Sequence, residues 1–285
     1  KKEELVSGNA LIEFATFIAI LFGTMFGIIV AYPYGNFISM AFILLLAIGG
    51  WYASLSIPSL PAINSEEKVN FNIFKTTLSL INETKKDRFI YYAVIGISWF
   101  WFIGSLLMAQ VPTLIDDVLK ADKWLINIFL SVFTLGIGVG SMLCNKVMKK
   151  SIHTTYVPIS ALIMTGALLF LSWLTQNNYF IQSDITSLRE FFTDIYGWGF
   201  VLALFLVSTA GGFFVVPLYS YIQINSPKET CSRIIGGLNV ISSFFMILSG
   251  VFVTALLRID FTMAQIFFAT AILNGFVTYL IFQLL

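Results

Sequence analysis

Apolar residues fill eight long segments of the chain, and polar residues are mostly confined to the stretches between them. The segments are residues 9–31, 36–57, 89–115, 124–146, 156–174, 197–222, 233–256 and 261–284. Each is close to the roughly 20 residues that a helix needs to cross a bilayer. The apolar runs are continuous rather than alternating, which favours helices over the strands of a membrane barrel. The pattern therefore predicts an all-α polytopic membrane protein.

One connection, residues 58–88, is long enough to hold structure of its own. Pro58 and Pro61 end the second segment, and a periodic apolar stripe follows. The stripe consists of Phe71, Phe74, Leu78 and Ile81, with Asn72, Lys75, Asn82 and Lys86 on other faces. This spacing predicts an amphipathic helix on the inner membrane surface. The alternative is a partly ordered linker.

Lysine and arginine are distributed unequally between the two sides of the predicted bundle. On one side lie 12 of the 16 basic residues, and the other side holds Lys120, Lys123, Arg189 and Arg258. Cytoplasmic loops carry the excess of basic residues, so both ends of the chain are expected in the cytoplasm. The chain begins at Lys1 in what resembles the middle of a loop, so we expect a fragment of a longer protein.

Composition narrows the function classes. The chain is 58% hydrophobic and 11% charged, whereas soluble domains are about 45–50% apolar and about 25% charged. A net charge of +1 without a basic stripe gives no reason to expect a nucleic-acid partner. No phosphate-binding loop is present, and His153 is the sole histidine, so we expect no cofactor, no metal and no catalytic site. Cys144 and Cys231 are expected to be free thiols.

Glu13 is the charged residue that most suggests function. It lies about one turn inside the first segment, where a carboxylate is costly and marks a candidate site. The alternative is that it reaches cytoplasmic water. Asn9 is one helical turn earlier and could share its face; its other possible role is a helix N-cap.

Further polar residues near segment ends are candidate substrate or gating contacts. Gln110 could bind a headgroup and Pro112 could kink a gating helix, or both could simply mark the outer end of the third segment. The remaining candidates are Gln223 at the interface, Arg233 at the water side and Asn239 about two turns inside the seventh segment. Trp99 and Trp101 are interpreted as interface anchors.

Glycines within the apolar segments are expected where helices pack closely, because small residues let membrane helices approach. These positions are Gly23, Gly27, Gly136, Gly140, Gly211 and Gly212. Because these glycines lie inside apolar segments, we do not interpret them as part of a dinucleotide-binding loop.

A weak internal repeat suggests how the segments are grouped. Residues 20–23 (ILFG) resemble residues 247–250 (ILSG), and six segments separate them. Transporters are often built from repeated halves. We therefore expect helices five to twelve of a protein of about twelve helices. Residues 1–57 would be the last two helices of an N-terminal bundle, 58–88 the central loop, and 89–285 a C-terminal six-helix bundle.

Three sequence stretches resemble a known family. Residues 210–218 (AGGFFVVPL) with 233–239 (RIIGGLN), and residues 5–13 (LVSGNALIE) with 20–23, resemble the bacterial lysophospholipid transporter family of the major facilitator superfamily. Residues 98–104 (SWFWFIG) with 110–112 (QVP) are closer to the transporter domain fused, in related proteins, to a lysophospholipid acyltransferase and acyl-carrier-protein synthetase. The resemblance implies part of a major facilitator fold.

The resemblance also implies a function. It suggests a multi-pass transporter, not an enzyme, that moves lysophospholipids such as lysophosphatidylethanolamine across the bacterial inner membrane toward the cytoplasmic leaflet by alternating access. Asn9, Glu13, Arg233 and Asn239 match family positions. The family expects a basic residue in the third segment, yet none lies between Arg88 and Lys120, so headgroup recognition differs here or lies elsewhere. Two alternatives stay open: the membrane part of a bifunctional acyltransferase, and a porter of another small solute.

Overall fold

The computed structural model describes residues 5–58, 72–148, 155–177 and 187–284, without the side chains of 25–36 and 281–284. The elements are α1 (Leu5–Ser54), α2 (Ile73–Thr84), α3 (Arg88–Thr113), the π-helical turn η2 (Leu114–Leu119), α4 (Trp124–Met148), α5 (Tyr156–Gln176), α6 (Leu188–Thr193), α7 (Ile195–Asn225), α8 (Cys231–Arg258) and α9 (Met263–Leu284). Within these ranges there is no strand, and eight helical stretches are long and apolar enough to cross a membrane. The predicted fold class is confirmed.

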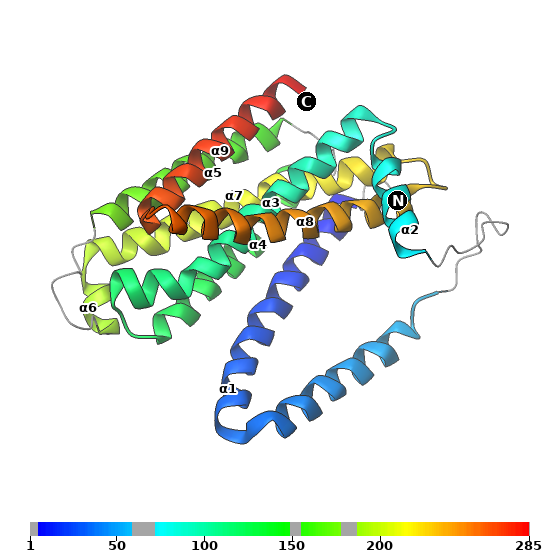
Figure 1. Ribbon diagram of the computed structural model, residues 1–285. Helices are drawn as coiled ribbons and strands as arrows, with labels where there is room; N and C mark the ends of the chain where they lie inside the picture. Colours follow the sequence, from blue (N-terminus) through cyan, green and yellow to red (C-terminus); the bar gives the residue numbers. More distant parts are fainter. Residues whose placement is uncertain (1–4, 59–71, 149–154, 178–186, 285) are drawn as a thin grey trace.

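The first two predicted segments form one helix that bends sharply. α1 runs for 50 residues, and Figure 1 shows it as two arms that meet at a tight bend. The bend falls between the candidate spans Leu5–Thr24 and Phe37–Ser54. Pro33 lies in this interval, and proline removes a helical hydrogen bond and is a common cause of kinks. A straight helix of this length would span about 75 Å, far more than the roughly 30 Å apolar core of a bilayer.

α7 forms the centre of the packed bundle. It contacts α4 and α5 along its length and also touches α1 and α3. Its side chains Phe200 and Phe214 are fully buried, and Phe200 stacks on Phe129 of α4 with ring centroids 6.4 Å apart. The second arm of α1, by contrast, has no buried residue in its membrane-length stretch.

Polar side chains join the helices around α7. Asn274 of α9 donates to the carbonyl oxygen of Ala161 and to Thr165 Oγ1 on α5, each at 2.9 Å. Two serine pairs, Ser98–Ser242 at 3.1 Å and Ser105–Ser249 at 2.7 Å, join α3 to α8. The two residues of each pair are 144 apart in the sequence, and the second pair lies one heptad after the first on both helices. The two helices therefore run parallel and keep the same register over that heptad.

The helix ends form two groups, one at each end of the bundle. The start of α1 meets the end of α4, where Asn145 Nδ2 donates to Ser7 Oγ at 3.4 Å. α2 packs on the start of α8. At the opposite end, Phe191 of α6 lies 5.8 Å from the ring of Phe129 near the start of α4. The direction of this bundle across the membrane stays a prediction.

The predicted amphipathic helix is present as α2. It begins at Ile73, and Asn72 caps it by accepting from the Lys75 backbone N–H at 3.0 Å. Asparagine is a favoured N-cap because its side chain satisfies a free N–H of the first turn. Phe71 and the rest of 59–71 lie outside the described residues.

Candidate functional site

Asn9 and Gln223 form a reciprocal amide pair between α1 and α7. Asn9 Nδ2 donates to Gln223 Oε1 at 3.1 Å, and Gln223 Nε2 donates back to Asn9 Oδ1 at 3.0 Å. Asn9 Nδ2 also lies 3.1 Å from Ser220 Oγ. α1 already begins at Leu5, so Asn9 lies inside the helix, and the N-cap interpretation of this residue is wrong. Its amide instead joins two helices that are far apart in the sequence.

Glu13 lies one turn deeper on the same helix. It is 5% exposed, so the interpretation that it simply reaches water is wrong. Its Oε2 is buried without a hydrogen-bond partner among the described residues. Tyr219 of α7 is close enough to interact with it electrostatically, and the Tyr219 hydroxyl accepts from Trp101 Nε1 at 3.4 Å. The site therefore holds a carboxylate oxygen with unused capacity to accept a hydrogen bond.

Aromatic rings line α1 just beyond Glu13. Phe17 stacks on Trp101 of α3 at a centroid distance of 5.8 Å, and it meets Phe100 edge-on at 6.2 Å. The site thus combines an acceptor with an apolar wall. Phe17 and Phe100 are themselves buried, so Glu13 lies beside an aromatic cluster of the core.

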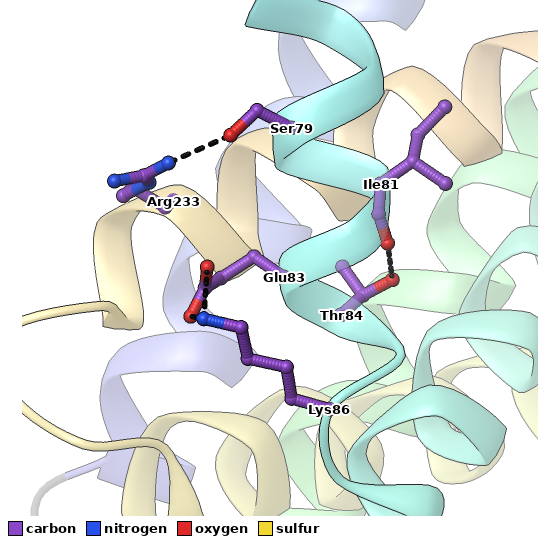
Figure 2. A network of polar contacts seen from close by, with 6 residues as sticks. All are labelled: Ser79, Ile81, Glu83, Thr84, Lys86 and Arg233. Atoms are coloured by element: carbon purple, nitrogen blue, oxygen red, sulfur yellow. Dashed lines mark hydrogen bonds and ion pairs between the residues drawn. The ribbon is translucent and has the colours of Figure 1, made fainter.

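Arg233 belongs to a second polar cluster, at the junction of α8 and α2. Figure 2 shows its guanidinium beside Ser79, where Nη2 donates to Oγ at 2.8 Å. Arg233 is half-buried. Lys86 and Glu83 form an ion pair at 2.9 Å next to it. The structure therefore places Arg233 in contact with the amphipathic helix α2.

Three other candidates do not join these clusters. Asn239 is exposed on α8. Gln110 and Pro112 lie in the last turn of α3, where the helix continues into the π-helical turn η2 rather than ending. Leu114 N–H still reaches the carbonyl of Gln110, so Pro112 leaves the helix connected at this position.

The predicted packing glycines lie mostly in the seam between α4 and α7. A Cβ added at Gly212 would lie 2.5 Å from the Ile137 carbonyl oxygen and 2.6 Å from the Ser141 nitrogen. Gly136 and Gly140 approach α7 even more closely, and Gly211 faces the ring of Phe100. Gly23 differs from the prediction, because a Cβ there would meet no described atom within 4 Å. Gly27 lies among the undescribed side chains.

Trp99 corrects another expectation. It is buried, stacks on Phe102 at 4.7 Å, and donates its Nε1 to Asn274 Oδ1 at 2.8 Å. It is a core residue rather than an interface anchor. Tyr219 and Ser220 were missed by sequence reasoning. The signal that could have found them is their position four and three residues before Gln223, which places them on the same helix face.

The described residues contain no group of three metal-ligating side chains. His153 lies outside those residues. The chemistry of the site is therefore derived from one carboxylate, two amides and the hydroxyls near them.

Comparison with known proteins identifies the family. The family profile of the Major Facilitator Superfamily matches residues 1–250. The chain belongs to this superfamily, a family of membrane transporters rather than enzymes. No solved structure matches the chain.

Curated relatives confirm the resemblance seen in the sequence. A lysophospholipid transporter LplT of Enterobacter sp. (strain 638) is 28% identical over 228 residues, covering 78% of this chain and 51% of the relative. A protein of the same name from Shigella sonnei (strain Ss046) is 26% identical over 231 residues, covering 79% and 52%. The chain spans about half the length of the curated relatives it matches.

Proposed function

We propose that this chain forms part of a secondary transporter that moves lysophospholipids, such as lysophosphatidylethanolamine, across the bacterial inner membrane toward the cytoplasmic leaflet. Membership of the Major Facilitator Superfamily and the names of the relatives support the transport class. The observation that carries the substrate class is Glu13, a carboxylate that is 5% exposed and has a buried oxygen without a partner in the described part of the chain.

Glu13 supplies what an amine headgroup needs. A carboxylate inside a membrane bundle is costly, and such residues pair with one another, with water or with a substrate. The ammonium of an ethanolamine headgroup would donate to Oε2 and neutralise the charge. The aromatic wall of Phe17 and Trp101 beside it would contact the glycerol and the acyl chain. Charge-assisted hydrogen bonds are the strong ones, worth about 1.5–3 kcal/mol.

The amide pair of Asn9 and Gln223 then forms a gate at the basic end of the bundle. It lies one turn from Glu13, about 6 Å along the helix. Its hydrogen bonds join α1 to α7 and can be exchanged one by one for water or headgroup oxygens. Opening the pair would separate the two helices and release the headgroup to the cytoplasmic side, as alternating access by rocking of two bundles requires.

The test is transport by the Glu13→Gln variant of the natural full-length protein in vesicles. Glutamine keeps the shape and removes the charge. We expect uptake of lysophosphatidylethanolamine to fall about ten- to a hundredfold, the equivalent of one charge-assisted hydrogen bond. Uptake of lysophosphatidylglycerol, which has no ammonium, should fall much less. Uptake is normalised to folded protein in the membrane.

Glu190→Gln is the matched control. Glu190 is an exposed carboxylate in the capping box of α6, and glutamine also serves at this position of the box. Its transport should equal that of the wild type. Unchanged uptake of both lipids by Glu13→Gln would refute the headgroup contact, and an equal loss for both lipids would reassign Glu13 to helix packing or gating.

A fused or separate acyltransferase partner is a prediction that rests on the resemblance of residues 98–112. The division into residues 1–57, 58–88 and 89–285 is likewise part of this proposal. The packing of α3, α4, α5, α7, α8 and α9 around one core supports the six-helix part of it.

A further inference from the structure

α2 is fastened to the start of α8 by close backbone contact. A Cβ added at Gly237 would lie 2.5 Å from the carbonyl oxygen of Leu80 and 2.7 Å from Thr84 Cγ2. Glycine at this position therefore lets the backbone of α2 lie against α8. The contact fixes one edge of α2 and leaves its other faces free to meet something else.

A polar clasp adds to this contact. Arg233 of α8 donates to Ser79 of α2 at 2.8 Å. Figure 2 shows Arg233 on one side of α2 and Ile81 pointing to the other side. Glu83, two residues after Ile81 in the same helix, forms an ion pair with Lys86. Leu80 and Thr84 thus face α8, and Ile81 packs against the hydrophobic core.

The remaining, exposed side of α2 carries large apolar side chains. Ile73 is 77% exposed, Phe74 is 89% exposed and Leu78 is 60% exposed. Lys75 and Lys85 on the same helix and its C-cap are also exposed. Three bulky apolar residues beside basic residues on one short helix form the pattern of a helix that lies in a membrane interface. We call Ile73, Phe74, Leu78, Lys75 and Lys85 the α2 surface.

We propose that the α2 surface binds the anionic lipid headgroups of the membrane and that α2 passes this contact on to α8. Charge complementarity argues for lipid, because basic residues near an anionic leaflet are each attracted to it. Placement supports the same occupant: the start of α8 and the end of α7 lie at the end of the bundle where the chain concentrates lysine and arginine. An amphipathic helix at that level meets headgroups.

Because α2 packs on α8, binding of lipid to the α2 surface can affect the position of α8. α8 is joined to α3 by the serine pairs Ser98–Ser242 and Ser105–Ser249. A displacement of α2 in the headgroup layer would therefore reach α8 through Gly237 and Arg233 and then α3. On this inference the lipid composition of the membrane biases the position of α8, independently of any lysophospholipid in transit.

The experiment measures hydrogen exchange of residues 73–84 and 231–240. The natural full-length protein is placed in nanodiscs of phosphatidylcholine, with or without phosphatidylglycerol. We expect slower exchange in both segments when phosphatidylglycerol is present. Lys75→Gln should reduce this protection of 73–84 about fivefold, which corresponds to about 1 kcal/mol per basic residue at an anionic surface. The double variant Phe74→Ser, Leu78→Ser should abolish it.

Two controls separate the proposal from its rivals. Lys228→Gln removes an exposed charge at the same end of the bundle but outside α2, and it should leave the protection unchanged. Ser79→Ala removes the acceptor of Arg233, so the lipid effect should persist in 73–84 and weaken in 231–240. The proposal fails if phosphatidylglycerol changes neither segment, or if Lys228→Gln acts like Lys75→Gln. It also fails if 73–84 is equally protected in phosphatidylcholine alone, which would indicate a protein segment covering α2.

Discussion

Replacing Gly212 by alanine tests the glycine seam that holds α7 against α4. The new Cβ would lie 2.5 Å from the Ile137 carbonyl oxygen, whereas ordinary contact begins at 3.4 Å. The obstructing atoms belong to the backbone of α4, so no side chain can rotate away. The two helices would have to separate by about 1 Å.

The magnitude follows from two opposed effects. Overpacking of this kind costs about 1–3 kcal/mol, and a rigid backbone partner places Gly212→Ala at the upper end. Alanine recovers about 1 kcal/mol over glycine in helix propensity. The net loss in free energy of unfolding is therefore about 2 kcal/mol. Spreading the seam also weakens its other contacts, because a gap of 0.5–1 Å forfeits about a quarter to a half of each dispersion well.

The assay is thermal unfolding of the purified natural protein in detergent, with lysophospholipid uptake measured in parallel. We expect a Tm several degrees below that of the wild type and reduced uptake, because α7 carries Gln223 and Ser220. Gly104→Ala is the matched control: it lies inside α3, and an added Cβ meets no described atom within 4 Å. Its Tm should be unchanged or slightly higher. Equal stability of the two variants would refute the seam.

Two more predictions concern the core and the topology. Asn274→Leu should lower the free energy of unfolding by about 1–2 kcal/mol, since it leaves the buried Trp99 N–H without its acceptor; a Tm equal to that of the wild type would contradict this. In a background with both native cysteines replaced by serine, Lys75→Cys should escape a membrane-impermeant thiol reagent in intact cells and Arg189→Cys should react, because of the unequal basic charge. Labelling of Lys75→Cys from outside would overturn the orientation.

Local patterns in the sequence are sufficient to predict most of the fold. Long apolar runs report helices directly, because a membrane helix satisfies its backbone internally and needs only length and hydrophobicity. The amphipathic helix α2 was also readable, since its stripe repeats at helical spacing. The seam glycines Gly136, Gly140 and Gly212 were readable for a steric reason: bulky neighbours surround positions without a side chain.

Contacts between helices that are far apart in the sequence could not be predicted from local patterns. Asn9 and Gln223 are 214 residues apart, and no local spacing says that α1 and α7 are neighbours. Trp99 was misplaced for a different reason. It lies 11 residues after Arg88, about 16 Å along the helix and thus near the middle of the bilayer core rather than at its edge. The predicted segment already begins at residue 89, so counting residues from that start would have placed Trp99 near the middle of the bilayer core.

The contacts of α7 differ in how easily they can be broken, and this difference indicates where the molecule can move. Toward α4 the seam places backbone against backbone at Gly140 and Gly212. Toward α1 the contact ends in three hydrogen bonds of Asn9, each of which a water or headgroup oxygen can replace at little net cost. Packed seams move as units, whereas exchangeable polar pairs open. We therefore expect α4 and α7 to rock together against α1, with Glu13 uncovered when the amide pair separates.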